Sequence, residues 1–260
     1  MKVRMKFKKS GAMKFVGHLD VMRYFQKAIR RADIDIMYSQ GYNPHQLMSF
    51  ASPLGLGLTS DAEYADLIIN HVESSEESIR RLNETMVEGF EVIGYREVIN
   101  ESKNAMSIVA AADYLVSLKD GYTFCDREGF DFKKEFEAFM TADEITILKK
   151  SKKSERIVDI KPWIYGCDFD LEKYYENSVA DRYENGNAVM MKLSSGSVNN
   201  LKPELVLEAF CNYLNVPFNE YAWQLHRIEL YENLRPGKEE DPVDLTALVP
   251  LDYETRKIGL

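Results

Sequence analysis

The first residues of the chain alternate between apolar and charged side chains. In residues 2–9 the apolar positions Val3, Met5 and Phe7 share one face and lysine or arginine occupies the other, which predicts a half-buried β-strand. In residues 19–32 the apolar positions recur at intervals of three or four, which predicts an amphipathic helix. The same two periods predict the remaining elements of the first half in this order: strand 47–51, strand 64–70, helix 75–86 and strand 90–98.

The order β-α-β-β-α-β is that of the ferredoxin-like, or split β-α-β, arrangement. The second half follows the same plan, with residues 145–149 and 156–160 forming a hairpin across residues 150–154. Its elements are strand 114–118, helix 132–140, the hairpin, strand 188–193, helix 204–214 and strand 224–231. We therefore expect an α+β protein with two ferredoxin-like halves that are joined near residues 100–104.

The predicted domains are residues 1–103, residues 104–231 and an extended tail at residues 232–260, and their charges differ in sign. The chain as a whole has 33 basic and 42 acidic side chains and a formal net charge of −9. Residues 1–60 contain ten of the basic and three of the acidic ones, which is +7, so the other 200 residues carry −16. This division predicts a basic working surface on the first domain and an acidic second domain.

Several classes of protein are excluded by the sequence. No run of about 18 apolar residues is present, so we expect no transmembrane helix and no membrane partner. The basic first residues have no apolar segment behind them, so we expect no secretory signal. Cys125, Cys167 and Cys211 are too widely spaced for a zinc site, an iron–sulfur cluster or a disulfide framework, so we expect reduced thiols in a cytoplasmic protein.

The polar side chains best suited to binding or catalysis gather around the first predicted helix. His18 stands at its start, Asp20 and Arg23 are one turn apart, and Arg30 and Arg31 lie in its last turn. The positive end of the helix dipole lowers the pKa of a histidine there, which suits it to donate or accept a proton. The structural alternative is capping, in which Asp20 binds helix N–H groups and His18 satisfies loop carbonyls.

The loop at residues 39–45 carries a second group of such side chains, which are Gln40, Tyr42, Asn43 and His45. In a split β-α-β fold this loop leads into the strand edge next to the first strand, so that His45 and His18 can converge there. The structural alternative is that Asn43 and the proline after it only turn the chain.

Six segments of the chain carry a resemblance to a known family. They are residues 15–20 (FVGHLD), 28–32 (AIRRA), 38–45 (YSQGYNPH), 49–64 (from SFA through LG to EY), 158–164 (VDIKPWI) and 201–203 (LKP). Together they resemble the radical-SAM-linked protein family, a bacterial domain of unknown function. The chain departs from that pattern at Asp35, Tyr42 and Gln46, and the helix and loop groups described above stay intact.

In that family the domain stands alone or is fused to a radical SAM enzyme with a cobalamin-type domain. The resemblance therefore implies a non-catalytic accessory subunit whose partner is a radical SAM/cobalamin-type protein. It also implies that the iron–sulfur cluster, S-adenosylmethionine and cobalamin belong to the partner and that this chain holds no cofactor. The chain has no cysteine triad of the CxxxCxxC type and no Gly-rich phosphate loop of the known kinds.

The residues favour RNA binding as the accessory role, in the modification or processing of tRNA or ribosomal RNA. Lysine and arginine side chains would meet the phosphates, and an aromatic ring would stack on a splayed base. The side chains assigned to RNA or partner binding are Arg4, Lys6, Asp20, Arg23, Arg30, Arg31, Gln40, Tyr42 and Asn43. Two observations oppose this hypothesis: alternating lysines on a strand can be a solvated face, and the isoelectric point near 5.1 is low for a nucleic-acid binder.

Two other functions stay open at the level of the sequence. One is an RNA-processing enzyme in which His18 and His45 act as general acid and base while Arg23 or Arg30 stabilises the developing charge. In a variant of it, His18, Asp20 and His45 hold a metal ion. The other function is a protein-only adaptor that docks the radical SAM partner through aromatic residues of the second half. These are Trp163, Tyr165, Phe169, Tyr174 and Tyr175.

Overall fold

The computed structural model describes residues 1–100, 103–150, 155–196, 199–237 and 242–259. The first half consists of β1 (Lys2–Lys9), η1 (Gly11–Phe15), α1 (His18–Arg31), β2 (Asp35–Ile36), β3 (Met48–Phe50), β4 (Thr59–His71), α2 (Ser75–Asn83) and β5 (Phe90–Val98). The second half begins with α3 (Ala105–Ile108), β6 (Val109–Leu118), α4 (Phe132–Met140), β7 (Thr146–Lys150) and β8 (Glu155–Asp159). It continues with η2 (Lys161–Trp163), β9 (Ile164–Asp168), α5 (Glu172–Tyr175), β10 (Ala188–Ser194), α6 (Pro203–Leu214), η3 (Glu220–Ala222) and β11 (Trp223–Asn233). The last residues contain η4 (Leu245–Ala247), β12 (Leu248–Pro250) and β13 (Thr255–Lys257).

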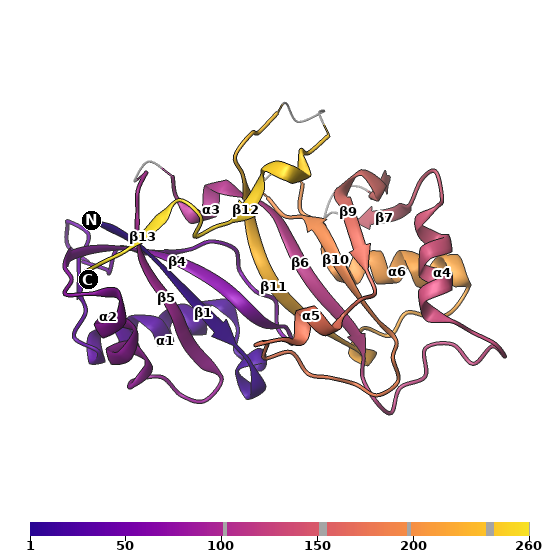
Figure 1. The fold of residues 1–260 in the computed structure, drawn as a ribbon, viewed down its shortest axis with the longest axis horizontal. Helices are drawn as coiled ribbons and strands as arrows, with labels where there is room; N and C mark the ends of the chain where they lie inside the picture. The colour runs from indigo at the N-terminus through magenta and orange to yellow at the C-terminus, as the bar shows by residue number, and fades with distance from the viewer. Residues whose placement is uncertain (101–102, 151–154, 197–198, 238–241, 260) are drawn as a thin grey trace.

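In the described residues, one mixed sheet of eleven strands runs through the molecule (Figure 1). The order along the sheet is β13-β5-β1-β4-β11-β6-β10-β9, with β2 and β3 paired to β4 and β12 paired to β11. The predicted hairpin is β7 and β8, which pair only with each other. The predicted α+β class is confirmed. None of the described helices has the length and apolar character needed to cross a bilayer.

The first half has its strands in the order β5-β1-β4-β3. β1 therefore lies between β5 and β4, and β3 lies on the other side of β4. α1 buries the apolar stripe that the sequence predicts, with Val21, Phe25 and Ile29 packed against Phe7 of β1 and its neighbours. α2 begins where the Ser74 hydroxyl accepts a hydrogen bond from a backbone N–H of the first turn. One hydrophobic core therefore lies between these two helices and the sheet.

The second half repeats this strand order as β11-β6-β10-β9. α4 and α6 pack on it through phenylalanine rings, among them Phe132, Phe136 and Phe210. α6 begins at Pro203, where the missing N–H is not needed, and ends at Asn215 in the left-handed conformation with φ of 56°. The two halves thus share one order of strands, while the ferredoxin-like description of each half stays a prediction.

β4 joins the two halves into one sheet. It pairs with β1 along one edge and with β3 along the other, and at Thr59 and Ser60 it pairs in parallel with β11. Strands from both predicted domains therefore belong to the same sheet. Residues 101–102 of the predicted junction and residues 151–154 of the predicted hairpin turn lie outside the described residues.

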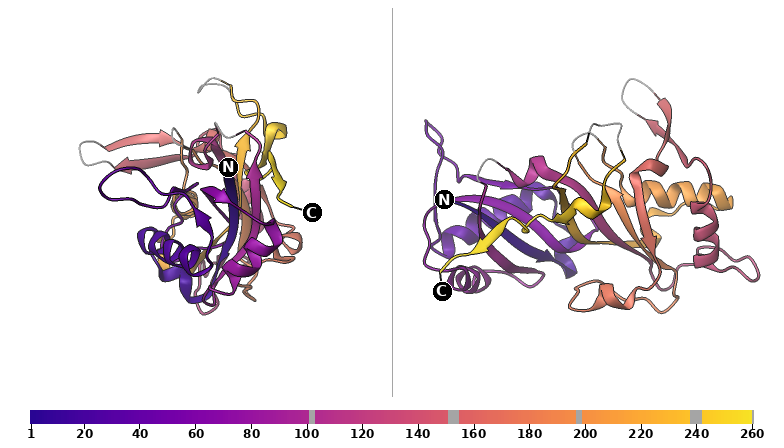
Figure 2. Two further views of the ribbon diagram at one scale, coloured as in Figure 1. Left: turned by 90° about the vertical axis from the view of Figure 1, so that its left-hand side faces the viewer. Right: turned by 45° about the horizontal axis from the view of Figure 1, so that its top comes forward.

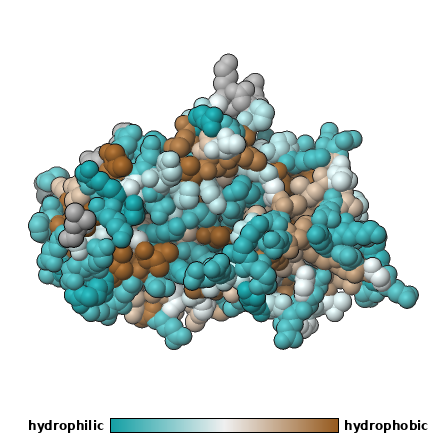
Figure 3. Space-filling view, in the orientation of Figure 1, coloured by the Kyte–Doolittle hydropathy of each residue, from teal (hydrophilic) through white to brown (hydrophobic). Residues whose placement is uncertain are grey.

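The predicted tail lies across the body of the protein. β12 pairs with the end of β11, and β13 pairs with β5, so the segment crosses from one half of the sheet to the other. In Figure 1 it passes in front of the sheet, whereas α1 lies behind it. Leu251 is completely buried, and residues 238–241 lie outside the described residues. This face is mostly hydrophilic, with apolar side chains gathered near β12 (Figure 3).

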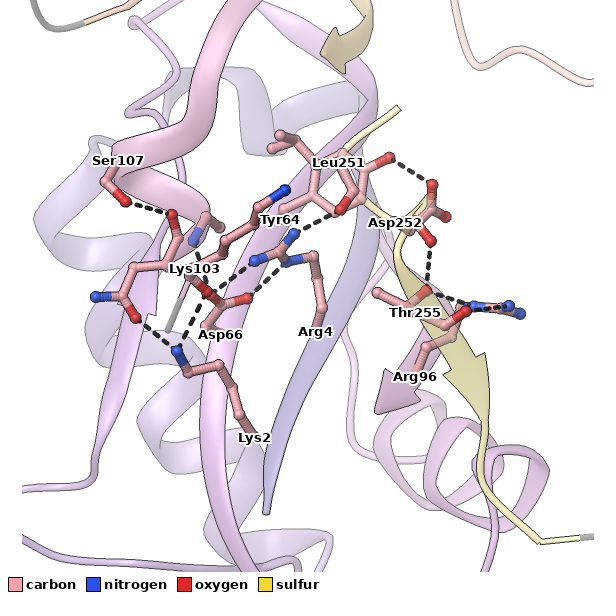
Figure 4. Close-up of polar contacts among 12 residues, drawn as sticks. Lys2, Arg4, Tyr64, Asp66, Arg96, Lys103, Ser107, Leu251, Asp252 and Thr255 are labelled. Carbon is pink, nitrogen blue, oxygen red and sulfur yellow. Dashed lines mark hydrogen bonds and ion pairs between the residues drawn. The ribbon is translucent and has the colours of Figure 1, made fainter. Parts of the chain in front are cut away.

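The charged face of β1 is covered by the tail, by residues 103–104 and by β11, so the prediction of a half-buried first strand is wrong. Arg4 is 3% exposed and donates to both carboxylate oxygens of Asp66, at 2.7 and 3.0 Å. It also donates to the Leu251 carbonyl at 2.5 Å (Figure 4). The second oxygen of Asp66 accepts the Ala105 N–H at 2.7 Å. Alternation along a strand reveals the apolar face but not what covers the other one.

Removing the carboxylate of Asp66 would leave the Arg4 guanidinium buried without a counter-charge. We expect Asp66→Ala to lower the free energy of unfolding by about 3–5 kcal/mol, measured by urea denaturation. The control is Asp20→Ala, because Asp20 and Arg23 form an ion pair that is exposed to solvent. That variant should lose less than about 1 kcal/mol. Equal losses in the two variants would contradict the structural role of the buried pair.

Candidate functional site

The outer face of α1 carries four cations in a row. Because Val21, Phe25, Ala28 and Ile29 turn inward, the opposite side of the helix faces solvent. The exposed cations are Arg23, Lys27, Arg30 and Arg31, which we call the cationic stripe.

Most of the charge of the cationic stripe is uncompensated. Arg23 has Asp20 at 3.1 Å, but both side chains are about two-thirds exposed, so the pair contributes little. Arg31 donates to the backbone carbonyl of Thr85 and keeps its charge. Lys27 and Arg30 have no ion-pair partner among the described residues.

The loop that follows β2 is a projecting hairpin. Tyr38 and Gln46 form an isolated β-bridge at its root, and the Ser39 N–H donates to the His45 carbonyl at 2.8 Å. The Gln46 amide donates to the backbone carbonyl of Gln26 at 3.2 Å, which fastens the root to the middle of α1. Figure 2 shows the loop extending away from the body. Its tip, which includes the predicted residues Gln40, Tyr42 and Asn43, is exposed, and the Tyr42 ring is completely so.

The structure does not bring the two predicted histidines together. His18 is the first residue of α1, and its ring packs edge-to-face with the ring of Phe50 at the end of β3. The two ring centroids are 5.4 Å apart. His45 precedes β3 and lies 2.8 Å from the Ser39 hydroxyl through its Nδ1. Five residues of extended chain, about 16 Å, separate His45 from Phe50. An acid–base pair needs both imidazoles at one reacting group, which this placement does not provide.

Burial lowers the pKa of His18, because the charged imidazolium loses hydration. The negative charge of Glu63 opposes this shift, and the positive charge of Lys9 adds to it. Among the described residues, no three His, Cys, Asp or Glu side chains are placed to hold a metal ion, and His18, Asp20 and His45 do not form such a group.

Arg4 and Lys6, which we assigned to RNA binding, face the interior of the protein. Arg4 is held by Asp66, as described above, and Lys6 binds a carboxylate oxygen of Glu229 at 2.7 Å. The other oxygen of Glu229 accepts the Tyr64 hydroxyl at 2.6 Å. These two cations neutralise internal carboxylates, and the remaining seven predicted binding residues are exposed. They are Asp20, Arg23, Arg30, Arg31, Gln40, Tyr42 and Asn43.

The aromatic residues suggested as a docking face of the second half are half-buried. Trp163 and Phe169 pack against the hydrophobic core, and the Tyr174 hydroxyl donates to Asp168 at 3.0 Å. Tyr165 and Tyr175 are likewise only partly accessible. This group therefore serves the packing of β9 and α5 more than an open surface.

The seam between the halves contains a buried charge cluster that the sequence did not reveal. Arg227 of β11 donates to both carboxylate oxygens of Glu63, at 2.8 and 2.7 Å, and both side chains are buried. Lys9 is buried beside them, and loss of hydration lowers its pKa. Glu63 lies among the buried residues of β4 and so needs a buried cation, but its partner is 164 residues away in the sequence.

A second polar group at the seam has the composition of a catalytic triad. His226 Nε2 lies 2.8 Å from an oxygen of Asp61 and 3.4 Å from the Ser178 hydroxyl, so both approach the same nitrogen. Its Nδ1 lies 2.8 Å from the Thr59 hydroxyl. The Thr59 hydroxyl and Asp61 do lie on opposite ring nitrogens, but the nucleophile of a triad must reach the substrate, and Thr59 is 1% exposed. The group therefore ties β4, β11 and the loop before β10 together.

Comparison with known proteins adds one finding. A family model described as an uncharacterized protein conserved in bacteria (DUF2344) matches residues 2–203. The match spans the cationic stripe, the projecting loop and the sheet up to β10, whereas β11, β12 and β13 lie beyond it. No curated protein matches the chain.

The lowered pKa of His18 predicts how the stability of the folded protein depends on pH. The folded protein binds this proton less tightly than the unfolded chain, so the contribution of His18 is complete above the ordinary value of 6.5 and is lost as the pH falls through the folded pKa. We expect His18→Gln to lose less unfolding free energy than the wild type between about pH 7 and pH 5. Urea denaturation at each pH measures this, and identical pH profiles would contradict it.

Proposed function

The chain belongs to the family of uncharacterized bacterial proteins DUF2344, and from that premise we propose that it is an RNA-binding accessory protein of a radical SAM enzyme. RNA would bind to the cationic stripe of α1 and to the projecting loop beside it. The observation that supports this most is that the Gln46 contact holds the root of the loop against α1, so that one side of the molecule carries both the uncompensated cations and a loop tip with a fully exposed aromatic ring.

The cationic stripe suits an RNA backbone. Arg23, Lys27 and Arg30 follow one another at intervals of four and three residues on one helix face, with Arg31 beside Arg30, and a row of cations of this kind neutralises successive phosphates. Such contacts position the RNA without reading its sequence. The exposed loop tip can supply the contacts with bases that the stripe does not make. The Tyr42 ring can stack on an unpaired base, and the amides of Gln40 and Asn43 can hydrogen-bond to base edges.

The net charge of −9 agrees with binding confined to one face. The acidic excess belongs to residues 61–260, while the cationic stripe lies within residues 1–60. Negative charge on the rest of the surface repels RNA there, and screening limits that repulsion to about 8–10 Å at physiological salt. Binding is therefore directed to α1 and its loop.

The radical SAM partner is proposed from the resemblance of the sequence motifs, and an apolar surface beside η1 offers it a contact. Phe15, Leu19 and Leu56 are 62–70% exposed. The Gly57 N–H donates to the Lys14 carbonyl at 2.8 Å, which brings the Leu56 loop next to Phe15. Exposed apolar side chains grouped in this way mark protein interfaces. A partner docked there would reach RNA held on α1.

The double variant Arg23→Gln/Lys27→Gln should weaken binding of bulk tRNA. Each lost phosphate contact reduces the slope of log K against log salt by about 0.7 on a single strand and about 0.9 on a duplex, so for two contacts with tRNA we expect a reduction of about 1.4–1.8. Filter binding or fluorescence anisotropy over a salt series measures both affinity and slope. The control is Lys173→Gln/Arg182→Gln, which removes two exposed cations of the second half. A wild type without salt-dependent binding would refute the proposed function.

Tyr42→Ala should remove a stacking contact and leave the fold unchanged. We expect the affinity for single-stranded RNA to fall by about 1–3 kcal/mol, the range for one stacked base. The melting temperature should stay the same because the ring is completely exposed. Tyr221→Ala, at an exposed tyrosine of the second half, is the matched control. If both variants bind like the wild type, Tyr42 does not contact RNA.

A further inference from the structure

A cavity of about 450 Å³ lies behind the projecting loop, between the end of α1 and α2. Its size is within the range of small-molecule sites. Its polar lining comes from five separate places in the first half: the end of α1, the two roots of the loop, the end of β4, α2 and β5. The polar lining residues include Arg30, Tyr38, Gln46, His71, Arg81 and Tyr95, together with the acids described below.

Two of these side chains are buried with unused hydrogen-bonding atoms. Gln46 is 4% exposed, and its Nε2 is occupied by the Gln26 carbonyl, whereas its Oε1 has no hydrogen-bond partner among the described residues. Tyr95 is 1% exposed, and its hydroxyl has none either. Buried polar atoms in folded proteins are normally satisfied, so an unpaired acceptor and an unpaired hydroxyl on one cavity point to a ligand.

The charged lining consists of two arginines, Arg30 and Arg81, and four acids, Asp33, Asp35, Glu73 and Glu77, so an anionic group fits at Arg30 and not elsewhere in the cavity. Arg30 has no ion-pair partner in the described part of the chain, whereas Arg81 pairs with the Asp33 carboxylate at 3.4 Å and also donates to the Asp33 backbone carbonyl at 2.6 Å. The nearby acids Asp35 and Glu77 are engaged by Asn70 and Arg80, at 2.8 and 2.6 Å. The apolar walls are formed by Ile34, Ile36 and Val72.

We propose that this cavity binds one nucleotide unit, with its base inside and its phosphate at Arg30. A nucleobase edge presents N–H donors for the Gln46 oxygen and a partner for the Tyr95 hydroxyl, and its flat faces suit the apolar walls. Arg30 belongs both to the cavity and to the cationic stripe, so a strand that follows the stripe reaches the cavity at this residue. This inference deepens the proposed function. Its statement that the nucleotide belongs to RNA rests on that function.

The decisive variant is Tyr95→Phe, because it removes one hydroxyl that has no protein partner. The fold should therefore be kept, with a melting temperature equal to or above that of the wild type. Tyr221→Phe, at an exposed tyrosine of the second half, is the matched control. Gln46→Leu is a second variant at the other unpaired atom. Its melting temperature reports any loosening of the loop root that would come from losing the contact to Gln26.

Binding is measured by calorimetry with two probes, the four free nucleoside 5′-monophosphates and a short single-stranded RNA. We expect Tyr95→Phe and Gln46→Leu to weaken binding of at least one probe about three- to tenfold, the range for one hydrogen bond, and Tyr221→Phe to have no effect. Weakened binding of the free monophosphates identifies a free nucleotide as ligand. An effect seen only with the oligonucleotide identifies a base of RNA.

Three results would overturn part or all of this account. If RNA binds with a normal salt slope and neither cavity variant changes any affinity, the nucleotide cavity is refuted and the RNA-binding surface stands. If free monophosphates bind and RNA does not, the proposed function is refuted and the cavity stands. If neither probe binds, both are refuted.

Discussion

The buried ion pair between Arg4 and Asp66 is the interaction that holds the C-terminal segment and the start of α3 against the sheet. A buried charge pair is tolerated only when its remaining donors and acceptors are satisfied, and here the Leu251 carbonyl and the Ala105 N–H satisfy them. β1, β4, the start of α3 and the C-terminal segment therefore meet at one point. On the opposite face of β4, Glu63 receives Arg227 in the same bidentate way, so the central strand is neutralised from both sides by distant parts of the chain.

These pairs decide which cations are available for a partner. The excess of +7 in residues 1–60 looks like one basic surface, yet Arg4, Lys6 and Lys9 are drawn into internal contacts. What faces solvent is the cationic stripe on α1, displayed because the other side of that helix fills the core. The proposed RNA surface thus consists of the cations that have no internal carboxylate partner, and it is confined to one helix and the loop attached to it.

Local patterns in the sequence predicted the α+β class, most of the helices and strands and the exposed side chains of α1 and the loop tip, because these depend on neighbours a few residues away. They missed β9 at the edge of the sheet and the strands β12 and β13 of the predicted tail. They did not predict the cover over β1, since it comes from residues 103–104, Glu229 and Leu251, nor the partner of Glu63, since Arg227 follows 164 residues later. Gln46 and Tyr95 gave no signal either: a neutral polar residue attracts notice only once its burial and its empty hydrogen-bonding atom are known.

The central claim is that RNA lies on α1 and the projecting loop. Ultraviolet crosslinking of the protein to bulk tRNA at low salt, followed by mass spectrometry of the crosslinked peptides, tests it directly. The account predicts crosslinks in residues 19–46, with the peptide that contains Tyr42 foremost. Crosslinks confined to residues 104–231, or none at low salt, would contradict it.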